Sequence, residues 1–514
     1  MTHLIAWPVL LPLITGFILI LAQTGGIHLR RTISFLAVIG LVLLSCALVS
    51  TSLTGQYQVY LLGNWTAPFG IVLVLDRLSA LMVLITALLA LGALWYAIAT
   101  NTDNKGAHFH VLFQLQLFGL NGAFLTGDVF NLFVFFEVLL LASYGLLLHG
   151  NGRLRTKAGL HYVVINLIGS TLFLFAVGAL YGVLGTLNIA DMAAKIAVAP
   201  ADDLGLIAAA GLLLLVVFGV KAAMFPLYLW MPRAYANTSA PVAALFAIMT
   251  KVGIYAIIRI HGTIFGSEAG ELAQYYAPWV LGLGLITLLL AALGVMAARG
   301  LREQVAYLVL ASVATLLIGV GLMTPAALSA TLYYMIHSTL IAGAMFLLAD
   351  VVLRGRGIYE DRFEAAPSMP NAIAIGSAFM FGAIAMTGMP PLSGFFGKVL
   401  ILSAALDHPW FAGAIFIILS AGLLTILTMA RSGSFLFYRT LPENAELTAT
   451  TPGEPLNRMA FVAVITLFFA GPVLVLFAQP ITEFTESAGN QLFNSTAYIE
   501  AVLSTPAVTE ATKR

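Results

Sequence analysis

Long uninterrupted runs of apolar residues dominate the chain, and short polar segments between them carry most of the charge. A helix needs about 20 predominantly apolar residues to cross the hydrocarbon core of a bilayer. By this criterion the pattern predicts fourteen spanning helices, each bounded to within a few residues. They cover residues 4–23, 33–52, 77–99, 109–127, 129–149, 160–185, 205–231, 239–262, 276–298, 302–323, 327–350, 371–405, 411–438 and 459–480.

The composition agrees with an all-α polytopic membrane protein. Of the 514 residues, 61% are hydrophobic and only 9% charged, which excludes large soluble catalytic domains. The 23 basic and 22 acidic residues nearly balance, so nucleic acid is not an expected partner. The single cysteine, Cys46, excludes a disulfide framework and a cysteine metal site, and we expect it to pack in the core.

The basic residues predict the orientation. Fifteen of the 23 lie in loops after odd-numbered helices, against four on the opposite side: Arg77, Lys195, Lys513 and Arg514. The positive-inside rule then places both termini outside the cytoplasm. The first run begins at Leu4 with no basic residue before it, so we expect it to remain as a helix rather than be cleaved as a signal peptide. Arg259, near a predicted helix end, is expected to extend toward the membrane surface.

The same pattern divides the chain into segments. Residues 1–108 hold three helices and, from Gln58 to Leu75, an expected outward β-hairpin around Gly63 and Pro68. Five-helix units follow at 109–262 and 276–438, then a last helix at 459–480 and a polar tail at 481–514.

Four charged side chains fall where lipid would disfavour them. Glu137, Lys221, Lys251 and Lys398 lie inside predicted spans, and each would cost about 3 kcal/mol or more at the bilayer centre if it faced lipid. All four are therefore expected to face inward, with Lys221 as the partner of Glu137. The alternatives are a structural ion pair for Glu137 and surface anchors for the lysines. Lysine, unlike arginine, can release a proton when desolvation or a neighbouring charge shifts its affinity.

His337 is the one histidine deep in a predicted span. A buried histidine is often only a packing residue, but imidazole exchanges protons near neutral pH, which favours a relay role here. No second histidine, cysteine or carboxylate lies at ligand spacing nearby, so a metal site is not expected.

Prolines predict two interrupted helices. Pro226 follows Lys221 in the seventh helix, and Pro390 and Pro391 precede Lys398 in the twelfth. Proline removes a backbone hydrogen bond and clashes one turn earlier, and interrupted helices at membrane depth line polar cavities. Each break falls in the fourth helix of a five-helix unit. Because five is odd, a repeated unit enters the membrane from opposite sides, which predicts an inverted repeat. Two unrelated kinks are the alternative.

Other motifs are missing. The Gly394–Lys398 stretch lacks the spacing of a phosphate-binding loop, and no cysteine cluster or haem attachment signature is present, so neither ATP nor a redox cofactor is expected.

The lysine and proline motifs resemble the antiporter-like subunits of Mrp-type Na⁺/H⁺ antiporters, respiratory complex I and membrane-bound hydrogenases. The resemblance rests on residues 221–232, which read KAAMFPLYLWMP, and residues 388–398, which read GMPPLSGFFGK. It implies fourteen helices with two inverted five-helix repeats. It also implies a mid-membrane proton path through Glu137, Lys221, Lys251, His337 and Lys398. The compact C-terminus and Glu137 with its flanking sequence most resemble the D-type subunit of Mrp antiporters.

We therefore expect a proton-translocating subunit of a bacterial inner-membrane antiporter, a transporter rather than an enzyme, without cofactor. Its expected partners are other membrane subunits, the lipid bilayer, H⁺ and Na⁺, with K⁺ as the other candidate cation. Hard cations need several oxygen ligands, and Glu137 alone supplies a mid-span carboxylate, so the cation route is expected in a partner subunit. Two alternatives stay open: a pump subunit driven by a redox module, and a passive scaffold whose buried ions only hold helices together.

Overall fold

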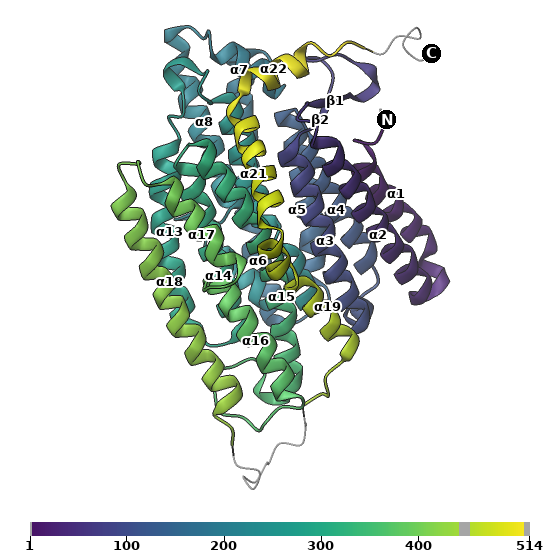
Figure 1. Cartoon of the computed structure of the whole chain (residues 1–514). Coiled ribbons are helices and arrows are strands. Elements are labelled where there is room, and N and C mark those ends of the chain that lie inside the picture. Colours follow the sequence, from purple (N-terminus) through teal and green to yellow (C-terminus); the bar gives the residue numbers. More distant parts are fainter. Residues whose placement is uncertain (1–2, 442–452, 508–514) are drawn as a thin grey trace.

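The computed structural model describes residues 3–441 and 453–507 as a bundle of helices with one small hairpin (Figure 1). The helices of the first half are α1 (Trp7–Leu21), α2 (Gly26–Ser52), α3 (Arg77–Ala99), α4 (Phe109–Leu125), α5 (Val129–Leu148), α6 (Arg153–Leu184), α7 (Ile189–Ile196), α8 (Ala201–Lys221), α9 (Trp230–Asn237), α10 (Ala240–Phe246), α11 (Met249–Ala256) and α12 (Gly262–Ile264). The second half contains α13 (Ala277–Ala297), α14 (Leu301–Gly321), α15 (Pro325–Arg356), α16 (Ala372–Thr387), α17 (Ser393–Ala404), α18 (Phe411–Gly433), α19 (Arg458–Phe468), α20 (Ala470–Leu476), α21 (Ala478–Phe493) and α22 (Ser495–Leu503).

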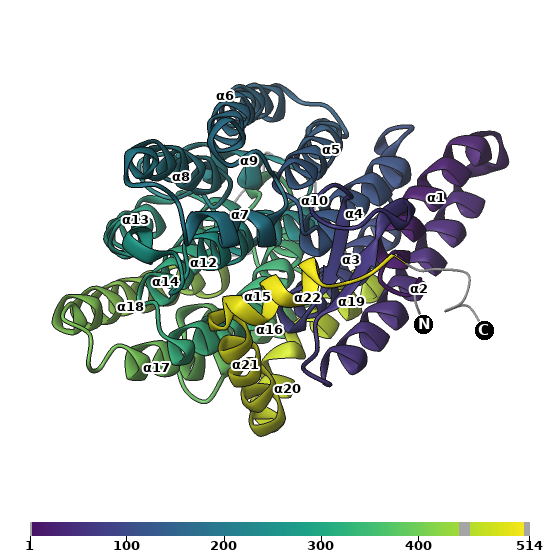
Figure 2. The same cartoon turned by 90° about the horizontal axis from the view of Figure 1, so that it is seen from above.

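These helices account for the predicted spans. Within the described residues, eleven helical segments are long and apolar enough to cross a membrane, and the first of them, Trp7–Ser52, contains both α1 and α2. The shorter apolar helices α4, α16 and α17 fill the remaining predicted positions. The chain is thus an all-helical polytopic membrane protein, as the sequence predicts. Viewed from above, α15 lies near the centre, with α1 and α2 at one edge and α18 at the other (Figure 2).

The two proline-containing helices are interrupted as predicted. α8 ends at Lys221 and α9 begins at Trp230, so Pro226 lies in a non-helical segment. α16 ends at Thr387 and α17 begins at Ser393, leaving Pro390 and Pro391 between them.

A third irregular span was not predicted. The apolar run at 239–262 divides into α10 and α11, followed by a π-helical turn at Ile257–His261 and α12. This segment is fully buried inside the bundle, so it has no lipid-facing side.

The predicted hairpin is present. β1 (Gln58–Leu61) pairs antiparallel with β2 (Val72–Leu75), with Gln58 opposite Leu75 and Leu61 opposite Val72. β2 is buried along its whole length. The hairpin lies at the same end of the bundle as α7, α22 and the first described residues (Figure 1). We name this the hairpin end, and we name the opposite end, which carries Arg299, Arg302 and Arg431, the arginine-rich end.

Arg259 corrects the sequence interpretation. It does not extend to the membrane surface: only 3% of it is exposed, and its Nη2 donates to both carboxylate oxygens of Asp76 at 2.7 Å. Asp76 also caps α3 through Ser79. The two partners are 183 positions apart in the sequence, so helix-end rules could not anticipate the pair.

Two other segments differ from expectation. Most of the segment expected as a polar tail is helical. α21 packs along α15, and its Thr485 accepts a hydrogen bond from Ser329 at 3.1 Å. Gln491 then reaches back toward the hairpin end, where its carbonyl accepts from the Tyr57 hydroxyl at 2.9 Å. Cys46 is exposed on the outer face of α2, so the expectation that it packs in the core was wrong.

We predict that Asp76→Asn destabilises the protein strongly. Breaking a buried ion pair from one side leaves an uncompensated charge and costs about 3 to 5 kcal/mol. The matched control is Glu360→Gln, because Glu360 pairs with Arg362 and their side chains are 47% and 61% exposed, and such surface pairs contribute about 0 to 1 kcal/mol. Thermal unfolding of the solubilised complex measures both. Equal melting temperatures for the two variants would contradict the assigned importance of the Asp76–Arg259 pair.

Candidate functional site

Glu137 and Lys221 are linked through α6 rather than by a direct ion pair. The Ser170 hydroxyl donates to Glu137 Oε1, and Lys221 Nζ donates to Asn166 Oδ1 at 3.1 Å. Asn166 and Ser170 are four residues apart and therefore occupy one face of α6. Within the described residues Glu137 and Lys221 form no direct ion pair, and the predicted pairing is indirect, through these two α6 side chains.

Lys221 is the last residue of α8 and is 7% exposed. Besides Asn166, its Nζ faces the Phe136 ring at 5.9 Å from the centroid, and Phe136 precedes Glu137 on α5. The Lys221 amine therefore contacts the Asn166 amide oxygen and the Phe136 ring, and the Glu137 carboxylate lies beyond these direct contacts.

The break after Lys221 is held by groups that do not titrate. Trp230 Nε1 donates to the Val220 carbonyl at 3.1 Å, and the Phe225 N–H donates to Thr287 Oγ1 at 2.9 Å. Ala223 has a left-handed backbone with φ of 55°, a conformation uncommon outside glycine. These contacts satisfy backbone groups that a continuous helix would satisfy internally.

Lys251 lies on α11, which packs directly on the end of α8. At Gly253 the helices approach so closely that a Cβ there would lie 2.4 Å from the backbone nitrogen of Ala222. The Lys251 side chain is completely buried, and within the described chain its Nζ has no hydrogen-bond partner. A buried amine without an acceptor is costly when charged, so this side chain needs water or movement before it can hold a proton stably.

His337, on α15, bridges the two halves of the second interrupted helix. Its Nε2 lies 3.1 Å from the Ala385 carbonyl near the end of α16, and its Nδ1 lies 2.7 Å from Ser393 Oγ at the start of α17. A carbonyl can only accept, so Nε2 carries a hydrogen and the Ser393 hydroxyl donates to Nδ1 when the ring is neutral. Gly394 permits this contact, since a Cβ there would lie 2.7 Å from Nε2.

Lys398 closes the same break from the other side. Its Nζ donates to the carbonyl of Thr387, the last residue of α16, at 2.7 Å. Gly388 between them has φ of +75°, and a Cβ there would lie 2.9 Å from Lys398 Cδ. His337 and Lys398 therefore bind carbonyls two residues apart, which places both at one helix end.

The structure thus places four of the five predicted residues in two pairs, and the fifth, Lys251, on a separate helix. Glu137 and Lys221 both bond to side chains of α6, and His337 and Lys398 both bond to carbonyls at the end of α16. Lys251 lies on α11, which packs against α8. Sequence analysis missed Asn166 and Ser170, although two polar residues four positions apart inside an apolar run are a detectable signal. No group of three or more metal-ligating side chains occurs within residues 3–441 and 453–507.

Known proteins resemble this chain over the region that contains these residues. Residues 126–425 match the family model described as NADH:quinone oxidoreductase/Mrp antiporter, transmembrane. The match covers more than half of the chain and includes all five titratable residues. The chain belongs to this family.

Two relatives match along nearly their full length. The chain is 40% identical to the D-type subunit of a probable K⁺/H⁺ antiporter of Rhizobium meliloti, with 98% of each chain covered. It is 35% identical to the D-type subunit of the Na⁺/H⁺ antiporter of Alkalihalophilus pseudofirmus, covering 98% of this chain and all of the relative.

Solved structures share the fold. A chain in the Mrp complex from Dietzia sp. superposes with a TM-score of 0.85 at 28% identity, covering 98% of this chain and 99% of that one. A chain of respiratory complex I from Thermus thermophilus gives a TM-score of 0.73 at 24% identity over 95% and 99% of the two chains. At that identity the second likeness speaks for the fold alone.

We predict that Ser393→Ala destabilises the second break. In the neutral ring, Nδ1 of His337 loses its donor, and an unsatisfied buried polar group costs about 1 to 3 kcal/mol. Ser403→Ala is the matched control, because Ser403 lies on the same helix but is exposed. Thermal unfolding of the solubilised complex should show a lower midpoint for Ser393→Ala only. An unchanged midpoint would mean that the Ser393–His337 bond contributes nothing to the stability of the break.

Proposed function

We propose that this chain is the D-type subunit of a multisubunit monovalent cation/H⁺ antiporter of the Mrp type, and that it conducts protons. The proton path runs from Glu137 and Lys221 through Lys251 to His337 and Lys398. Full-length similarity to the D-type subunits of two antiporters supports the assignment to an antiporter, a transporter rather than an enzyme. Among the five residues, the observation that carries the path is the placement of His337 and Lys398 on the carbonyls of one interrupted helix.

Glu137 acts by setting the proton occupancy of Lys221. A nearby carboxylate favours the charged amine, and moving the carboxylate away disfavours it. Asn166 and Ser170 hold the two groups on one face of α6, so a shift of α5 against α6 changes their separation without breaking the fold. The proton gradient supplies the energy, at about 2.3 kcal/mol for each charge moved across 100 mV.

The exchanged cation is Na⁺ or K⁺. The two relatives differ in the cation that their names give, and a hard cation needs several oxygen ligands. In this chain Glu137 is the one carboxylate among the five path residues. We therefore assign the cation route to a partner subunit of the complex.

The chain is a multi-pass protein of the bacterial inner membrane in this proposal. The excess of basic residues supports an arginine-rich end in the cytoplasm and both termini on the outer side. Residues 109–262 and 276–438 form the two inverted units, a proposal supported by a helix break in the fourth predicted span of each.

A redox-driven pump subunit is the second candidate, because the matched family model is described as covering both NADH:quinone oxidoreductase and Mrp antiporter subunits. Co-purification separates the two functions. Iron-sulfur or flavin polypeptides bound to the chain would favour the pump, whereas small membrane subunits alone would favour the antiporter.

The central test is exchange in everted vesicles that contain the full complex, followed with pH-sensitive dye after addition of Na⁺ or K⁺. We expect Lys398→Ala, Lys221→Ala and Glu137→Gln each to abolish exchange while the complex still assembles. Lys195→Ala, which removes a partly exposed lysine at the hairpin end, is the matched control and should exchange normally.

Each contrary result has a specific meaning. Normal exchange by Lys398→Ala would refute its terminal role. Loss of assembly with normal specific activity in the remaining complexes would instead support a scaffold whose buried ions only hold helices together.

We further predict an intermediate defect for Ser170→Ala. A hydrogen bond to a charged group contributes about 1.5 to 3 kcal/mol, and losing that orientation of Glu137 should slow exchange about tenfold or more. Thr171→Val is the control, since its hydroxyl bonds only to its own helix at Leu167 and is exposed. Initial rates in the same vesicles measure the difference, and equal rates for the two variants would remove Ser170 from the path.

A further inference from the structure

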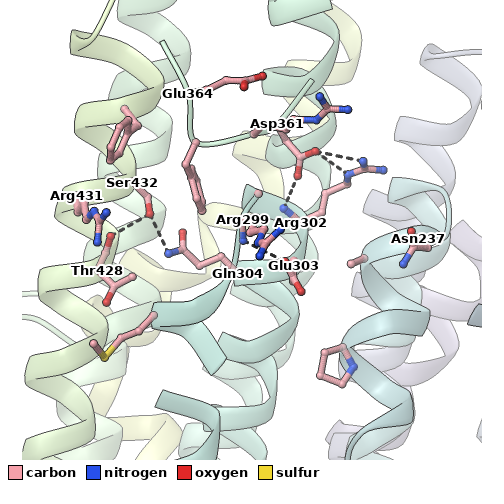
Figure 3. A pocket seen from close by; sticks show the side chains of 18 of the residues that line it. Asn237, Arg299, Arg302, Glu303, Gln304, Asp361, Glu364, Thr428, Arg431 and Ser432 are labelled. Atoms are coloured by element: carbon pink, nitrogen blue, oxygen red, sulfur yellow. Dashed lines mark hydrogen bonds and ion pairs between the residues drawn. The ribbon is translucent and has the colours of Figure 1, made fainter. Parts of the chain in front are cut away.

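A large polar cavity opens at the arginine-rich end of the second half. It has a volume of about 750 Å³ and is bordered by α9, the α13–α14 connection, the segment around Asp361 and the end of α18 (Figure 3). Its wall carries an ion pair between Arg302 and Asp361 at 3.1 Å and the carboxylates of Glu303 and Glu364. We name this cavity the basin, and its charged groups make it suited to hold water.

A second, much smaller cavity borders Lys398. Its volume is about 20 Å³, and the polar residues of its lining are Ser312, Thr315, Tyr334, Lys398 and Thr425. A cavity of about 10 to 15 Å³ with polar partners suffices for one water molecule. One water thus fits beside the amine.

The two cavities are separated by a single helical turn. On α18 the basin reaches Thr428 and the small cavity reaches Thr425; on α14 the basin reaches Gln304 and the small cavity begins at Leu308. Three or four residues of α-helix are one turn, so the same short layer divides the cavities on both helices.

Polar atoms lie on both sides of this layer. Gln304 is fully buried; its Nε2 donates to Ser432 Oγ at 2.9 Å, and its Oε1 has no partner among the described residues (Figure 3). The hydroxyls of Ser312, Thr315, Thr425 and Thr428 donate to carbonyls of their own helices. Each hydroxyl oxygen therefore keeps lone pairs that can accept from water.

We infer that Lys398 exchanges protons with the arginine-rich end along this stripe, which we name the polar file: Gln304, Ser312, Thr315, Thr425, Thr428 and Ser432. This inference rests on the proposed proton path and adds an opening to it. Waters bridge the one-turn layer when the Leu308 side chain moves aside. A proton then passes from water in the basin to the Lys398 amine, and the reverse step returns it.

Cysteine modification tests the water route without requiring transport. In a Cys46→Ala background, single cysteines replace Thr425 or Thr428 in the full complex, and Ag⁺, a thiolate-binding ion of about the size of a water molecule, is added to either face of the vesicles. Leu427→Cys is the matched control, because Leu427 neighbours Thr428 but is 59% exposed on the outer face of α18. Thiols react as thiolates, which form in water and not in hydrocarbon.

We expect Thr425→Cys and Thr428→Cys to react about tenfold or more faster than Leu427→Cys, from the arginine-rich face. Adding Gln304→Leu should slow Thr425→Cys and leave Thr428→Cys, which borders the basin, much less affected. If Thr425→Cys reacts no faster than Leu427→Cys, or only from the hairpin-end face, the polar file is wrong.

The two proposals fail separately. Absent modification with normal exchange in the unmodified complex overturns the polar file and leaves the proposed function standing. Modification as expected, with normal exchange by Lys398→Ala, overturns the path and leaves the water route standing.

Discussion

Backbone carbonyls freed inside a membrane must find donors, and this requirement governs the second interrupted helix. Lipid offers no hydrogen bonds, so an open helix end at membrane depth persists only where protein or water satisfies it. Here Lys398 donates to the Thr387 carbonyl, and His337 adds a donor to the Ala385 carbonyl, which also accepts from the Gly388 N–H. Both side chains can exchange protons. Charge-assisted hydrogen bonds are roughly twice as strong as neutral ones, so the strength of the hydrogen bond from Lys398 to the Thr387 carbonyl depends on whether the amine is charged. Protonation and the geometry of the break are therefore physically coupled.

The first break is built differently. Its freed groups are met by the indole of Trp230 and the hydroxyl of Thr287, neither of which titrates in the physiological range. Lys221 is consequently free to bind Asn166 and to respond to Glu137 through α6. In the proposed path the two breaks therefore play different parts: at the first, Glu137 acts on Lys221, and at the second, Lys398 holds a helix end.

The sequence predicted what depends on local pattern. Apolar runs located the spans, prolines located both breaks, and β-branched residues around Pro68 located the hairpin. It could not predict what depends on distant partners. Asp76 and Arg259 meet across 183 positions, and α21 packs along α15, a contact that its own sequence does not specify. Cys46 sits in an apolar run, but hydrophobicity alone does not distinguish a lipid-facing residue from a core residue in a membrane protein.

Lys251 shows that the five residues do not form one continuous chain of hydrogen bonds in this structure. Lys221 and Lys398 each donate to an oxygen, whereas the described residues offer the Lys251 amine none. A charge resting there would lack compensation, so in the proposed path a proton would cross this position only when water enters or when α11 shifts on α8. Gly253 makes such a shift sensitive to the first break, since it packs within contact of the Ala222 backbone at the end of α8. A movement of that helix end would therefore act two residues from Lys251, and in the proposed path it would link the event at Glu137 and Lys221 to the hydration of Lys251.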